Sequence, residues 1–150
     1  MNNVYRWTPL LARILISLIF ITSGFGKLTH LTETSAHIAQ AGLPMPYVAA
    51  LIAGLVELGG GLGILFGCGT RCAAATLFLF LIPVTYCFHN PIGLVGAIRM
   101  TQQTQLVKNL AIMGGLLMLF GFGPGPGSVD ARRRPRGLFA NLFGERPLGA

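Results

Sequence analysis

Charged residues are scarce in this chain, and acidic residues are the scarcest of all. Only 10% of the 150 residues are charged, and Asp and Glu together account for four of them. A soluble domain of ordinary composition has about 25% charged residues. The chain is also 53% hydrophobic, and its mean hydropathy is +0.67. This composition argues against an ordinary soluble domain and predicts one small integral protein of the lipid bilayer.

The chain also lacks the sequence patterns that hold metals, haem and nucleotides. Its three cysteines, Cys68, Cys72 and Cys87, form no Cys-x-x-Cys pair and no zinc-ligand spacing with the three histidines. No haem-attachment motif and no nucleotide-binding loop occurs in the sequence. We interpret the cysteines as small apolar residues within helices and expect no metal site.

The positive charge of the chain does not indicate a nucleic-acid partner. The net charge is +7, but five of the eleven basic residues lie in the last 19 positions. The other basic residues are scattered around apolar stretches, which is typical of membrane-topology signals rather than of a DNA-binding face.

Four apolar stretches predict the fold. They cover about residues 8–26, 47–67, 72–88 and 106–122, lengths suited to helices that cross a hydrocarbon core of about 30 Å. We expect an all-α membrane protein, built as a left-handed antiparallel bundle of four transmembrane helices. Polar connections follow at 27–46, where we expect some interfacial helix, and at 89–105. A signal peptide is the alternative for the first stretch, but Phe25 and Lys27 fit a cleavage site poorly, so we favour a retained helix.

The distribution of basic residues predicts the domain limits and the orientation. Residues 1–123 should form the four-helix domain, and residues 124–150 a basic tail that is either flexible or bound to the membrane surface. Four spans place both chain ends on one side, which then carries eight of the eleven basic residues, whereas Lys27, Arg99 and Lys108 lie on the other side. The positive-inside rule therefore predicts that both termini are cytoplasmic.

One charged residue stands near the middle of the second apolar stretch. Glu57 is the only formal charge in residues 47–67, and a carboxylate at this depth costs roughly 2.5–3.5 kcal/mol, so it should face protein and have a partner. Lys27, Lys108 and Arg13 are the candidate partners. Two interpretations fit: a structural ion pair that fixes helix register, or a polar pocket for a proton or a small anionic or quinone-like ligand.

Further polar residues lie near these charges. On the first helix Arg13, Ser17 and Lys27 fall on one face, and that face should look into the bundle. Ser23 is a further candidate for the ion pair or ligand. His89 and Asn109 are expected near the outer ends of the third and fourth spans, where they would line the mouth of the pocket.

Several short motifs, taken in order, resemble the DoxX family of small bacterial four-helix inner-membrane proteins. They are Arg13 with SGFGK (residues 23–27), GLPMP (42–46), Glu57 followed by glycines, GTR (69–71), KNLAIMGG (108–115) and GPGPGSVDARR (123–133). The resemblance covers roughly residues 10–133 and implies a location in the bacterial inner membrane.

The resemblance also implies a functional hypothesis. Some members of the family are subunits of quinone-reducing thiosulfate oxidation systems, and another is linked to membrane complexes that handle redox stress. The chain would then be a membrane anchor or quinone-associated subunit of an oxidoreductase assembly, with a partner subunit or a second copy of itself. Any electron transfer would need a bound quinone or that partner. The alternatives are a carrier for a small solute and a structural scaffold without chemistry of its own.

Overall fold

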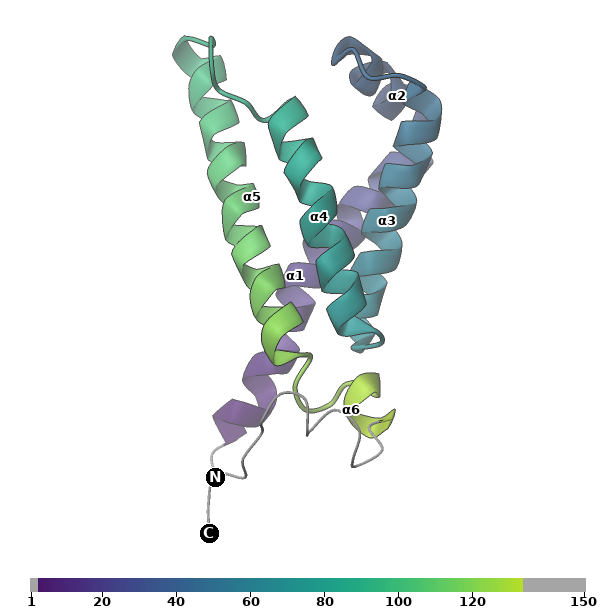
Figure 1. The fold of residues 1–150 in the computed structure, drawn as a ribbon, viewed down its shortest axis with the longest axis vertical. Coiled ribbons are helices and arrows are strands. Elements are labelled where there is room, and N and C mark those ends of the chain that lie inside the picture. The colour runs from purple at the N-terminus through teal and green to yellow at the C-terminus, as the bar shows by residue number, and fades with distance from the viewer. Residues whose placement is uncertain (1–2, 134–150) are drawn as a thin grey trace.

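The computed structural model describes residues 3–133, and within this range it contains six helices and no strand. Four are long: α1 (Asn3–Thr29), α3 (Pro46–Phe66), α4 (Thr70–Phe88) and α5 (Gly96–Phe122), while α2 (Leu31–Gln40) and α6 (Val129–Arg133) are short. In the described residues the long helices supply four segments that are long and apolar enough to cross a membrane. They run alternately up and down (Figure 1). The predicted all-α fold with four spans is confirmed.

The helix boundaries differ from the predicted ones mainly in α5. This helix begins at Gly96, whereas the sequence predicted a connection as far as residue 105. The segment 97–105 is polar, so hydropathy places it outside the membrane. Its glutamines, methionine and alanine are nevertheless good helix formers, and the helix continues through them. As a result, Lys108 lies in the middle of a helix rather than in its first turn.

The two ends of the bundle are built differently. We name them by the short helix at each, the α2 end and the α6 end. Toward the α2 end, α5 spreads away from α3, whereas the long helices converge toward the α6 end (Figure 1). The first connection does contain a helix, α2, as expected for residues 27–46. Residues 134–150, which make up most of the predicted basic tail, lie outside the described residues.

A small core joins the four long helices. Its buried side chains come from α1, α3, α4 and α5: Phe20, Ile64, Ala74, Leu77, Leu81, Leu116 and Leu119. Many other large apolar side chains point outward, and Leu15 and Leu79 are 70% and 63% exposed. In water such a surface would be unfavourable, but lipid tails are as apolar as leucine. The exposed apolar surface is therefore the lipid-facing surface of a membrane protein.

Candidate functional site

The centre of the candidate site is an ion pair between α1 and α3. Lys27 Nζ lies 2.7 Å from Glu57 Oε2 and also donates a hydrogen bond of 2.6 Å to Ser23 Oγ. Ser23 and Lys27 are four residues apart on α1, so they lie on the same face one turn from each other. The Glu57 side chain is 6% exposed and that of Lys27 is 28% exposed. The carboxylate is thus enclosed by protein, while the Lys27 side chain remains partly exposed.

A close approach of two backbones places α1 and α3 at this distance. A Cβ atom added to Gly24 would lie 2.5 Å from the backbone nitrogen of Leu58 and 2.8 Å from the carbonyl oxygen of Gly54. Only glycine fits at such a contact, as is common where membrane helices pack tightly. Gly24 lies between Ser23 and Lys27 in the chain, so the crossing point of the two helices also aligns the ion pair.

Arg13 does not belong to this ion pair, although its sequence position made it a candidate partner of Glu57. Arg13 precedes Gly24 by eleven residues, which is about 16 Å along a helix, and so lies toward the α6 end. Its side chain is only 1% exposed. Its Nη2 atom donates a 3.4 Å hydrogen bond to the carbonyl oxygen of Gly127, and the charge of Asp130 acts on it. Arg13 therefore holds the segment that follows α5.

Asp130 makes structural contacts near Arg13 that the sequence did not predict. Its carboxylate accepts hydrogen bonds of 2.9 Å from the backbone nitrogens of Gly69 and Thr70, and one of 3.0 Å from Thr70 Oγ1. Its own backbone nitrogen donates to the carbonyl oxygen of Gly67 at 2.8 Å. Asp130 thus caps the N-terminus of α4 from a distant part of the chain, where a negative charge is favourable. The chain has only four acidic residues, and this scarcity was the sequence signal that could have identified Asp130.

The remaining predicted site residues are on α4 and α5. Asn109, which is 5% exposed, donates through Nδ2 to Thr85 Oγ1 at 3.0 Å. His89 Nδ1 and Gln102 Oε1 are 3.0 Å apart. The first contact joins α4 to α5, and the second joins the residue that directly follows α4 to α5. Lys108 is exposed, and its side chain makes no hydrogen bond or ion pair within the part of the chain that the structure describes.

Of the predicted site residues, the structure therefore brings together Ser23, Lys27 and Glu57. An ammonium group has three N–H donors, and Lys27 uses two of them on Ser23 and Glu57. The third has no side-chain acceptor among the described residues and can donate to a further acceptor that reaches the ammonium. Among the described residues there is no group of three His, Cys, Asp or Glu side chains placed to hold a metal ion. The arrangement can donate one hydrogen bond from a charge-neutral pair at membrane depth.

Comparisons with known proteins agree with the fold. The family model named DoxX matches residues 8–90. The chain is 37% identical over 121 residues to inner membrane protein YqjF of Escherichia coli (strain K12), which covers 81% of this chain and 88% of that protein. It is 33% identical over 123 residues to inner membrane protein YphA of the same organism, covering 82% and 88%. No solved structure gives a significant match. The chain belongs to the DoxX family.

Proposed function

We propose that this protein is an inner-membrane subunit of an oxidoreductase assembly and that it binds a quinone headgroup beside Lys27 and Glu57. The observation that carries the proposal is the unused N–H donor of Lys27. A quinone carbonyl oxygen is a hydrogen-bond acceptor, and the ammonium of a partly exposed lysine in a membrane-spanning helix is a suitable donor for it. The resemblance to the DoxX family, some members of which are subunits of quinone-reducing systems, is the reason for proposing redox chemistry.

The chemistry divides between the ligand and the chain. A bound quinone supplies electron-carrying capacity, which none of the amino acids described here provides. Lys27 orients the headgroup through its third N–H group. Glu57 balances the charge of Lys27, so the site holds a neutral ligand without adding net charge at membrane depth. Ser23 keeps the ammonium from rotating away from α3 by accepting its second hydrogen bond.

The proposal is tested by measuring which small molecules the gently purified protein retains. Solvent extraction and mass spectrometry should find quinone with the wild-type protein and much less with Lys27→Met. The matched control is Glu33→Gln, which neutralises an exposed acidic residue on α2 and should leave quinone retention unchanged. Equal retention by wild type and Lys27→Met would contradict the proposed site. Solute flux into liposomes that contain the pure protein would instead favour a carrier.

We also propose that both chain termini are cytoplasmic. The first long helix begins and α5 ends at the α6 end of the molecule (Figure 1), and eight of the eleven basic residues belong to that side in a four-span topology. A reporter that is active only in the cytoplasm should be active when fused after Ala150. Activity of an exclusively periplasmic reporter at this position would reverse the orientation.

A further inference from the structure

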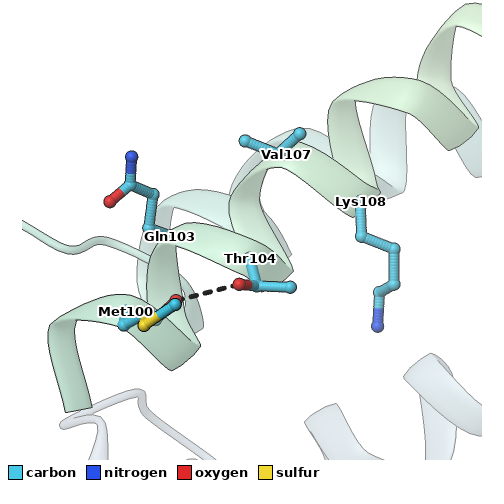
Figure 2. Close-up of a pocket in the computed structure, with 5 residues that line it drawn as sticks. All are labelled: Met100, Gln103, Thr104, Val107 and Lys108. Carbon is cyan, nitrogen blue, oxygen red and sulfur yellow. Dashed lines mark hydrogen bonds between the residues drawn. The ribbon is translucent and has the colours of Figure 1, made fainter. Parts of the chain in front are cut away.

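A pocket lies along one side of α5, apart from the Lys27–Glu57 pair. It has a volume of about 570 Å³ and is lined by Met100, Gln103, Thr104, Val107 and Lys108. These positions follow the i, i+3, i+4, i+7, i+8 spacing of one helix face. Figure 2 shows Lys108 extended away from the helix, with no labelled side chain beside its ammonium group. Thr104 lies one turn before Lys108, and its hydroxyl donates to the carbonyl oxygen of Met100 at 3.0 Å.

The depth of Lys108 places its ammonium group near the headgroup layer. Lys108 precedes the end of α5 at Phe122 by fourteen residues, which is about 21 Å along a helix. With Phe122 at one boundary of a hydrocarbon layer of about 30 Å, the far boundary is about 9 Å from Lys108. A long lysine side chain extends toward that boundary, where a negative charge can pair with it.

The described chain does not supply that negative charge. Glu57 is paired with Lys27, and Asp130 caps α4. Glu33 is exposed on α2, and no ion pair joins it to Lys108 within residues 3–133. The fourth acidic residue, Glu145, lies outside the described residues. The lining of the pocket includes no acidic side chain at all.

We propose that this pocket binds the anionic headgroup of a phospholipid, with Lys108 as the residue that pairs with its phosphate. The pocket is an open groove lined by α5 alone and is not an enclosed cavity, so a lipid of the surrounding bilayer can reach it. Its lining combines one cation and the polar Gln103 and Thr104 with the apolar Met100 and Val107. This combination matches a molecule that is charged at one end and apolar at the other. Charge complementarity selects an anionic lipid over a zwitterionic one.

The proposal is tested with the full chain in nanodiscs that contain equal amounts of phosphatidylglycerol and phosphatidylcholine. After release into mild detergent, native mass spectrometry counts the lipids that each protein retains. We expect wild type to retain phosphatidylglycerol in preference, and Lys108→Met to lose this preference by about fivefold, the effect of one basic residue near an anionic surface. Lys108→Arg, which keeps the charge, should retain the preference. Arg99→Met is the matched control, because it removes another exposed cation of α5 outside the pocket lining.

A second measurement covers the case in which a variant folds poorly. Added phosphatidylglycerol should raise the melting temperature of wild type and of Arg99→Met more than that of Lys108→Met. The proposal is wrong if Lys108→Met keeps the lipid preference, or if Arg99→Met loses it to the same extent. It is also wrong if millimolar inorganic phosphate displaces the lipid completely, which would indicate a site for a free anion. Retention of a second membrane protein in place of lipid, lost in Lys108→Met, would identify an acidic partner helix as the occupant.

Discussion

Removing either charge of the Lys27–Glu57 pair should lower the free energy of unfolding, and the loss should be larger for Lys27 than for Glu57. In Lys27→Met the carboxylate of Glu57, whose side chain is 6% exposed, loses its only ion-pair partner in the described residues. Breaking a buried pair in this way costs 3–5 kcal/mol. Because the Lys27 side chain is 28% exposed and the pair is partly screened, we expect the lower end, about 3 kcal/mol of unfolding free energy.

The partner variant should be less severe. Glu57→Gln replaces the carboxylate acceptor with a neutral amide, and the ammonium of the partly exposed Lys27 side chain still donates to Ser23 Oγ at 2.6 Å. We expect a loss of about 1.5 kcal/mol, the difference between hydrogen bonds to charged and to neutral groups. The double variant contains neither charge, so its loss should be about 2.5 kcal/mol instead of the sum of the two. The coupling energy is then about 2 kcal/mol.

The measurement is an SDS titration of each variant in mixed micelles, followed by far-UV circular dichroism. Glu33→Gln is the control for removal of an acidic residue from the surface, and it should match wild type within about 0.5 kcal/mol. A coupling energy below about 0.5 kcal/mol would refute the argument, as would a larger loss in Glu57→Gln than in Lys27→Met. The first result would mean that the pair does not hold α1 against α3. The second would mean that the ammonium of Lys27, and not the carboxylate of Glu57, is the charge that is costlier to leave unpaired.

Three further predictions concern packing and capping. Gly24→Ala should destabilise the protein by at least about 2 kcal/mol, because its Cβ would lie 2.5 Å from the Leu58 backbone nitrogen. At Gly26, in contrast, an added Cβ meets no atom within 4 Å, so Gly26→Ala in the same titration should be neutral or stabilising. Equal effects of the two substitutions would disprove the close crossing. Asp130→Ala should cost about 1–2 kcal/mol by removing the cap of α4, measured as a lower melting temperature, while unchanged melting would show that α6 does not stabilise the bundle. Asn109→Leu should cost about 0.6 kcal/mol, the usual strength of an interhelical hydrogen bond in a membrane protein, and a double-mutant cycle with Thr85→Val that gives no coupling would contradict the contact.

The spans were predictable because hydropathy measures a local property of the chain. The four apolar stretches were recognised from composition alone, and the structure confirms four helices that can cross a membrane. The early start of α5 was not predicted, because hydropathy reports where a helix would enter lipid and says nothing about where it begins. Helix propensity in residues 97–105 carried that information.

The polar contacts were predictable only where helix periodicity determines them. The spacing of Ser23 and Lys27 places both on one face of α1. The sequence nevertheless left Lys27, Lys108 and Arg13 as candidate partners of Glu57, and the structure selects Lys27. The partner of Arg13 depends on a segment more than a hundred residues away, since its hydrogen bond to Gly127 spans 114 positions. No local pattern encodes a contact of that kind. The same holds for Asp130 and the N-terminus of α4.

The cap that Asp130 provides to α4 also has a consequence for biosynthesis. Asp130 lies 60 positions after Thr70, whose backbone N–H donates a hydrogen bond to the Asp130 carboxylate. At synthesis rates of about 5–20 residues per second, Asp130 is translated about 3–12 s after Thr70, the first residue of α4. Helices α1 to α4 therefore enter the membrane while the junction between α3 and α4 is still incomplete. The ribosome must have translated most of the chain before the α6 end of the bundle can close, so a nascent chain arrested within α5 would display that open junction to the cell's membrane quality control.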